Sequence, residues 1–180
     1  MATRSLLKKR TLFVASKYEV DSLIDSVKDL LSPLGIGVQR EVAEAYDEAV
    51  QKIKASVKNK LYDLIFANIL VPPQKINIDK IVETKKIMRD GSVRTYYDIP
   101  GFTDRSVWEM ITYTGGLAKL CKKLKLSMPI IFCHQCRGGI STPSKLRLLR
   151  YKNVFGTYFY PFSKKNTKEL QRIISEAVLK

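Results

Sequence analysis

Short apolar runs alternate along the chain with longer segments in which apolar residues recur every three or four positions. The short runs are rich in β-branched and aromatic residues, as is typical of buried strands. We therefore predict five strands, at Thr11–Ala15, Ile36–Val42, Asp63–Val71, Met128–His134 and Val154–Tyr160.

The longer segments between these strands have the period of amphipathic helices. Lys17–Leu31 and Tyr46–Leu61 show it most clearly, and Asn166 is predicted to cap the last helix. Each crossover can hold a helix, so the strands should be parallel and covered on both faces. Right-handed crossovers then predict an α/β fold, a flavodoxin-like doubly wound five-stranded sheet with the strand order 2-1-3-4-5.

Residues 72–103 interrupt this alternation after the third strand. Lys80–Ile87 and Ser92–Ile99 flank the dipeptide Asp90-Gly91, which favours a two-residue hairpin turn. We predict an inserted β-hairpin arm in an otherwise single domain that spans residues 1–180.

The composition indicates a folded and strongly basic protein. The chain has 180 residues, 32 Lys plus Arg and 17 Asp plus Glu, so its formal net charge is +15. Such a charge attracts polyanions. Three cysteines are too few for a disulfide scaffold, and no apolar run reaches the ~20 residues of a membrane span. We expect a cytoplasmic protein with no membrane partner.

The positive charge gathers in the predicted arm and in the C-terminal half. Cations neutralise phosphates, and tyrosine rings can stack on exposed bases. A two-stranded ribbon can also enter a DNA major groove. The predicted nucleic-acid contacts are Lys85, Lys86, Arg89, Arg94, Tyr96, Tyr97, Lys145, Arg147 and Arg150.

Three segments of the predicted sheet are Tyr62–Pro72 (YDLIFANILVP), Met128–Phe132 (MPIIF) and Gly156–Phe162 (GTYFYPF). They resemble the third, fourth and fifth strands of the receiver domain of two-component response regulators. The resemblance covers all five strands and is interrupted by the insertion. The resemblance implies the same sheet order and a regulatory role.

The positions that carry the chemistry of this family differ here. The acidic pair after the first strand is replaced by Ala15 and Ser16, and the phosphoacceptor aspartate by Asn68. The hydroxyl of the fourth strand is replaced by His134, and the lysine of the fifth strand by Tyr160. Because Mg²⁺ needs oxygen ligands, usually carboxylates, we expect no metal, no cofactor and no phosphotransfer. The chain resembles an atypical pseudo-receiver with a neutral polar cluster at its strand ends.

Three functions fit these observations. The favoured one is a non-catalytic, phosphorylation-independent regulatory protein that contacts nucleic acid through the arm and the basic C-terminal half. The second is a protein-interaction module, or a homodimer, that uses the fourth helix, fifth strand and fifth helix and accepts an acidic partner. The third is a TIR-like or nucleoside-cleaving nucleotide hydrolase. It requires a carboxylate near the strand ends, where Glu41, Glu44 and Glu48 are the nearest in sequence.

Overall fold

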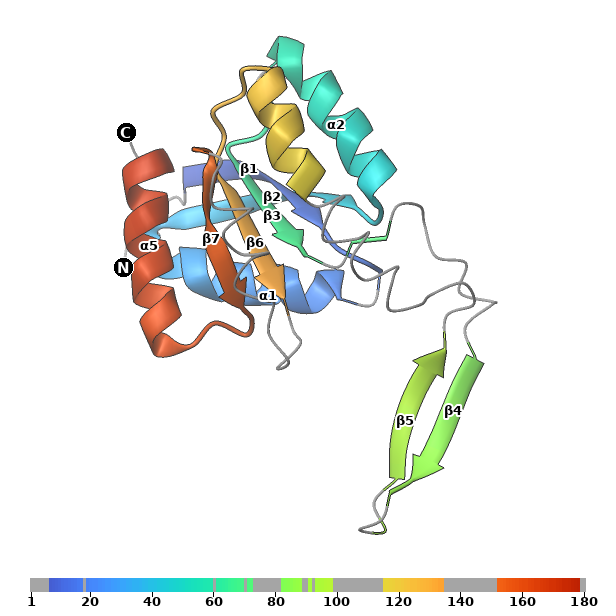
Figure 1. The fold of residues 1–180 in the computed structure, drawn as a ribbon. Helices are drawn as coiled ribbons and strands as arrows, with labels where there is room; N and C mark the ends of the chain where they lie inside the picture. The colour runs from blue at the N-terminus through green and yellow to red at the C-terminus, as the bar shows by residue number, and fades with distance from the viewer. Residues whose placement is uncertain are drawn as a thin grey trace.

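Five parallel strands form one sheet in the order β2-β1-β3-β6-β7 (Figure 1). The structure is a computed structural model that describes residues 7–17, 19–59, 61–69, 71–72, 82–88, 91, 93–98, 115–134 and 152–178. The strands are β1 (Leu7–Val14), β2 (Ile36–Ala43), β3 (Leu64–Asn68), β6 (Ile130–His134) and β7 (Val154–Phe159). Counted within this sheet, the order is the predicted 2-1-3-4-5, and the flavodoxin-like fold class is confirmed.

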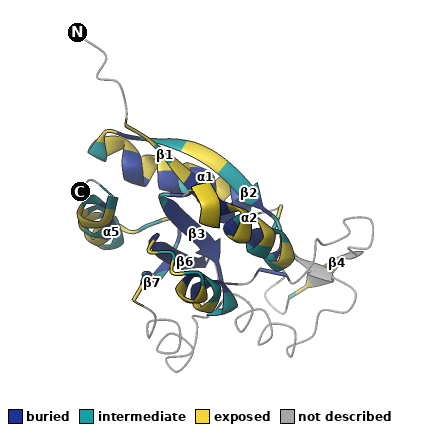
Figure 2. Ribbon diagram, turned by 90° about the horizontal axis from the view of Figure 1, so that it is seen from above, coloured by how far each residue is buried: buried dark blue, intermediate teal, exposed yellow. Residues whose placement is uncertain are grey.

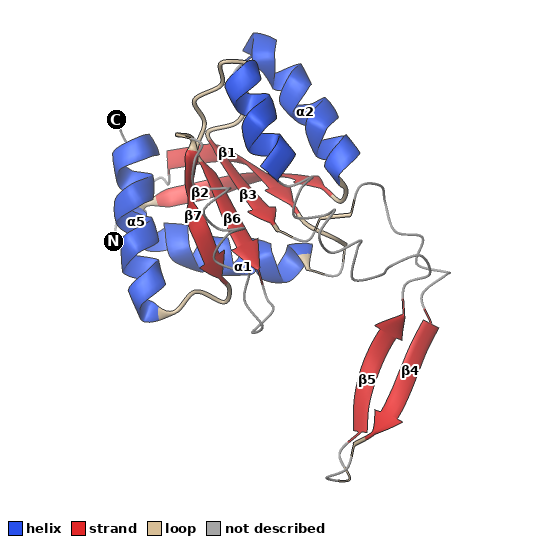
Figure 3. Cartoon of the chain, viewed as in Figure 1, coloured by secondary structure: helices blue, strands red, loops and turns tan. Residues whose placement is uncertain are grey.

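Helices cover both faces of this sheet (Figure 3). Helices α1 (Val20–Leu31) and α5 (Lys164–Val178) pack on one face. Helix α2 (Tyr46–Asn59) and the helical segment 115–123 pack on the other. The amphipathic period of these helices is explained by this arrangement, because each buries one face against the sheet.

The core is divided into two layers by the alternation of side chains along the strands. Leu12 and Val14 of β1 point toward α2, whereas Phe13 between them points toward α1. Phe13 stacks on Phe66 of β3, with ring centroids 6.0 Å apart and an interplanar angle of 15°. The central strands are buried on both sides (Figure 2), which is why they read as uninterrupted apolar runs.

The edge strand β7 contains a bulge at its start. Ile130 and Ile131 are consecutive in β6, but their partners in β7 are Val154 and Gly156, so one residue of β7 is left over. Gly156 has a φ of 144°, and a Cβ there would lie 2.5 Å from the ring of Tyr158. Both the positive φ and the close approach of the Tyr158 ring therefore require glycine at this position.

The cap of the last helix differs from the prediction. Helix α5 begins at Lys164, and Ser163 Oγ accepts a hydrogen bond from the backbone N–H of Asn166 at 3.2 Å. Ser163 is thus the N-cap, and Asn166 is the third residue of the helix. The prediction was wrong because Asn and Ser are both strong capping residues, and their local sequence does not rank them.

Strands β4 (Val82–Ile87) and β5 (Val93–Asp98) form a separate antiparallel ribbon. Ile87 lies opposite Val93, so each residue of β4 is separated from its partner in β5 by an odd number of residues. A two-residue turn would require an even number, and the predicted two-residue turn is therefore wrong. The backbone N–H of Gly91 instead donates to the carbonyl of Met88, 3.0 Å away, with Gly91 at a φ of 77°. The remaining residues of the predicted arm lie outside the described ranges. No helix in the described ranges is long and apolar enough to span a membrane.

Candidate functional site

The residues predicted at the strand ends gather at the carboxyl edge of the sheet. Asn68 and His134 are the last residues of β3 and β6, and Tyr160 follows β7. The backbone N–H of Tyr160 donates to the carbonyl of His134 at 3.0 Å. Ala15 and Ser16 follow β1, the neighbour of β3 on its other side. In open α/β sheets this edge is where ligands bind.

Asn68 is the centre of a hydrogen-bond network at this edge. Its Nδ2 donates to the Oη of Tyr160 at 3.4 Å, and its carboxamide also bonds the carboxyl of Glu19. Ser16 Oγ donates to Glu19 Oε2 at 2.9 Å. Asn68 and Tyr160 are 1% and 0% exposed, whereas Ser16 and Glu19 are half-buried, so the network runs from the core to the surface.

Glu19 is the functional group that the sequence reasoning missed. The predicted cluster was neutral, but the carboxyl of Glu19 lies within it, so that expectation needs correction. Burial raises the pKa of Glu19 above its ordinary value of 4.5, and the hydrogen bonds from Ser16 and Asn68 act in the opposite direction. A carboxyl of this kind can hold or release a proton closer to neutral pH than an exposed one.

The other members of the predicted cluster have more ordinary surroundings. Ala15 is fully buried in the layer against α1 and brings no polar group to the edge. His134 is 7% exposed and meets the ring of Phe159 edge-on, with centroids 5.6 Å apart and an interplanar angle of 75°. Within the described ranges, no three His, Cys, Asp or Glu side chains gather as a metal ion would require.

The carboxylates named for the hydrolase alternative belong to a different cluster. Glu41 pairs with Lys52 at 2.9 Å, and Glu48 lies 3.8 Å from the same ammonium. Glu48 Oε2 also accepts a hydrogen bond from the backbone N–H of Glu44 at 3.0 Å. These contacts join β2 to α2, whereas the carboxyl that bonds Asn68 and Ser16 at the strand ends is that of Glu19.

The cysteines of the described chain are buried. Cys121 packs between α2 and the sheet, and burial raises its pKa to about 12. Cys133 packs on the opposite layer, where burial raises its pKa strongly. Both thiols therefore stay protonated, and neither is an activated nucleophile.

The predicted nucleic-acid contacts fall partly within the ribbon. Lys85 is exposed, Lys86 lies opposite Arg94, and the next pair on that face is Thr84 with Tyr96. Tyr97 lies opposite Glu83 on the other face. The remaining predicted contacts, Arg89, Lys145, Arg147 and Arg150, lie outside the described residues.

Comparisons with known proteins give distant structural matches. No protein-family model matches the chain, and no curated protein matches it either. A signal receiver domain of an HD domain-containing protein from Pseudomonas fluorescens Pf-5 matches with a TM-score of 0.48 and 13% identity, over 96% of this chain and 95% of that one. A 3-dehydroquinate dehydratase-like protein from Bifidobacterium longum matches with a TM-score of 0.41 and 10% identity, over 97% of both chains. The strand order places this protein among flavodoxin-like folds.

Proposed function

We propose that this protein is a non-catalytic regulatory protein that binds nucleic acid through the ribbon of β4 and β5. The observation that carries the proposal is the register of the ribbon, in which Lys86 lies opposite Arg94. Like charges at directly opposite positions of an antiparallel pair are unfavourable. This pairing is better suited to holding an anion than to stabilising the ribbon.

The neighbouring positions suit a nucleic acid. Thr84 and Tyr96 form the next pair on the same face as Lys86 and Arg94, and an aromatic residue beside cations is the usual combination for stacking on a base while its phosphate is neutralised. The exposed Lys85 adds a cation on the other face of the ribbon. A ribbon of two strands is narrow enough to enter a major groove.

A bound partner would also stabilise the ribbon. Two-stranded hairpins are marginally stable in water at best. Figure 1 shows β4 and β5 apart from the five-stranded sheet, with which they share no strand pairing. Docking on a polyanion would supply the missing stabilisation, and the net charge of +15 would steer the encounter.

Regulation by this protein would not depend on phosphorylation. The amide of Asn68 cannot form the acyl phosphate that a carboxylate forms, and its hydrogen atoms are used toward Tyr160 and Glu19. In this proposal the network at the sheet edge has a structural role, and the ribbon binds the nucleic acid.

A protein partner is the second candidate, and one observation favours it. Ile87 and Val93 lie opposite each other at one end of the ribbon and are 80% and 61% exposed. An exposed apolar pair is a common anchor for another protein or a second copy of this chain.

Charge reversal tests the nucleic-acid proposal. The double variant Lys85→Glu, Lys86→Glu is compared with Lys17→Glu, Lys54→Glu, which changes the net charge equally at exposed positions outside the ribbon. Binding of a fluorescent duplex and a fluorescent single strand is followed by anisotropy over a range of salt concentrations. The ribbon variant should bind at least about tenfold more weakly and with a shallower salt dependence, while the control stays near the wild type. Equal losses in the two variants would show attraction by net charge alone and contradict the role of the ribbon.

A further inference from the structure

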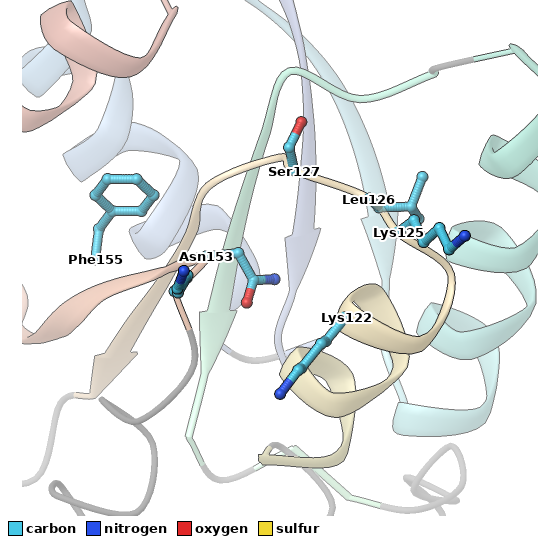
Figure 4. Close-up of a pocket in the computed structure, with 7 residues that line it drawn as sticks. Lys122, Lys125, Leu126, Ser127, Asn153 and Phe155 are labelled. Atoms are coloured by element: carbon cyan, nitrogen blue, oxygen red, sulfur yellow. The ribbon is translucent and has the colours of Figure 1, made fainter.

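A pocket of about 390 Å³ lies at the amino edge of the sheet, opposite the edge that holds Asn68 (Figure 4). It forms where the chain passes from the helical segment 115–123 to β6 and where it enters β7. Its lining residues are Lys122, Lys125, Leu126, Ser127, Lys152, Asn153 and Phe155. The volume of this pocket is larger than that of a single inorganic anion and lies within the range of volumes of small-molecule binding sites.

The lining is cationic and contains no acid. Lys122, Lys125 and Lys152 all contribute to it, and none of them forms an ion pair in the described part of the chain. All three lysines are exposed, and Figure 4 shows the side chains of Lys122 and Lys125 extending in different directions, so each can turn toward an anion in the pocket by a change of rotamer. The arrangement therefore favours a ligand with more than one negative charge.

The backbone at Lys125 is a second, independent observation. Lys125 has a φ of 55°, in the left-handed region that favours glycine. Its N–H donates to the carbonyl of Lys122 at 3.1 Å, and the N–H of Leu126 donates to that of Cys121 at 2.9 Å. These two bonds form a Schellman motif, in which this position is usually glycine. A lysine here strains the backbone, and this lysine is one of the residues that line the pocket.

Asn153 supplies a third observation. Its backbone carbonyl accepts a hydrogen bond from Ile130 at 2.7 Å, which fixes the residue between the starts of β6 and β7. Its side-chain Nδ2 is shielded from solvent and has no hydrogen-bond partner in the part of the chain that the structure describes. Such a donor is unfavourable without an acceptor. A small rotation of the carboxamide would present it to an oxygen atom in the pocket.

We propose that this pocket binds a small phosphorylated ligand. Phosphate oxygens would accept hydrogen bonds from the ammonium groups of Lys122, Lys125 and Lys152. Asn153 and the hydroxyl of Ser127 would donate to the remaining oxygens. Leu126 and Phe155 give the pocket an apolar wall, which suits an organic phosphate such as a nucleotide better than a bare ion.

Cations at the end of a helix also have an ordinary role, because they offset the helix dipole. Lys122 and Lys123 share that role at the end of the helical segment 115–123, but only Lys122 lines the pocket. Lys123→Gln is therefore the matched control for Lys122→Gln. Lys125→Gly is a further test, since it removes an ammonium and also relieves the left-handed φ, so it should keep or raise the melting temperature.

Isothermal titration calorimetry of the full chain with ADP, pyrophosphate and adenosine tests the proposal. ADP or pyrophosphate should bind saturably, and Lys122→Gln and Lys125→Gly should each weaken that binding by about tenfold. Lys123→Gln should stay within about twofold of the wild type. Asn153→Asp, which replaces a donor by an anion, should also weaken binding.

Three results would overturn the proposal. The first is the absence of saturable binding of ADP and pyrophosphate at concentrations up to about 1 mM. The second is an equal loss of affinity in Lys122→Gln and Lys123→Gln. The third is binding of adenosine as tight as that of ADP. The ribbon variant Lys85→Glu, Lys86→Glu should keep its affinity for ADP. The pocket and the nucleic-acid function can therefore fail separately.

Discussion

Asn68 donates a hydrogen bond from Nδ2 to the Oη of Tyr160, 3.4 Å away, and so ties the end of β3 to the residue after β7 across the strand between them. The same carboxamide bonds Glu19, which precedes helix α1. One buried side chain thus connects the sheet edge to a helix.

Asn68→Asp should destabilise the fold. The variant loses the amide donor to Tyr160 and Glu19 and gains a buried carboxylate beside the half-buried one of Glu19, and two carboxylates in contact resist simultaneous ionisation. We expect the free energy of unfolding to fall by about 2–3 kcal/mol near pH 7, and by less at an acidic pH at which one of the two groups is protonated. Chemical denaturation at both pH values measures this. Asn68→Ala, which loses the donor without adding charge, should show a loss that does not depend on pH in this way.

Glu19→Gln should change how stability depends on pH. Burial raises the pKa of Glu19 above 4.5, so the folded state holds this proton more tightly than the unfolded state. The resulting stabilisation is present below pH 4.5 and is lost as the pH rises through the raised folded value. The wild type should therefore lose stability relative to Glu19→Gln over that window. A constant difference between the two proteins across the titration would contradict the raised pKa.

The wild-type protein should not become phosphorylated at the sheet edge. An amide nitrogen cannot form the acyl phosphate that an aspartate forms, and position 68 is Asn. Incubation with a small phosphodonor and Mg²⁺ should leave the intact mass unchanged. A gain of one phosphate that peptide mapping assigns to this edge would refute the hypothesis that this protein acts without phosphorylation.

Gly156→Ala should be among the more destabilising single substitutions. Its φ of 144° disfavours any side chain, and the added Cβ would lie 2.5 Å from the ring of Tyr158. Tyr158 cannot move freely, because its hydroxyl donates to Glu169 at 3.0 Å. We expect a loss of about 2–4 kcal/mol in the free energy of unfolding. Thr157→Ala at the next position of β7 is the control, and a similar loss there would point to the strand in general.

Ser163→Ala should cost more than Asn166→Ala. Ser163 Oγ accepts a hydrogen bond from the backbone N–H of Asn166, whereas Asn166 is itself a residue of the first turn of the helix. Loss of a cap costs about 1 kcal/mol, and replacement of Asn by Ala inside a helix costs little or is favourable. Thermal unfolding of the two variants measures the difference. The reverse ranking would restore Asn166 as the cap.

Local pattern was sufficient for the elements that repeat a simple period. The apolar runs around Phe13, Phe66 and Phe132 predicted buried strands, and their crossovers predicted a parallel sheet with the order that the structure has. This works because a strand buried on both faces must be apolar throughout, and a right-handed crossover leaves few arrangements.

Details that depend on a single residue in a turn or a helix cap were harder to predict from the sequence. The register across Ile87 and Val93 and the choice of Ser163 over Asn166 differ from the prediction by only a few positions. Several neighbouring residues have similar propensities there, and small differences in packing decide between them.

Period and composition alone predicted the strands of the sheet, the helices between them in the described ranges and the strongly cationic character of the chain. The contact of Glu19 with Asn68, and the pocket that Lys122, Lys125 and Lys152 line, become visible in the folded chain and not in its sequence. Such contacts join residues far apart along the chain. Their distance in space is set by how the layers pack, and no local pattern contains that information.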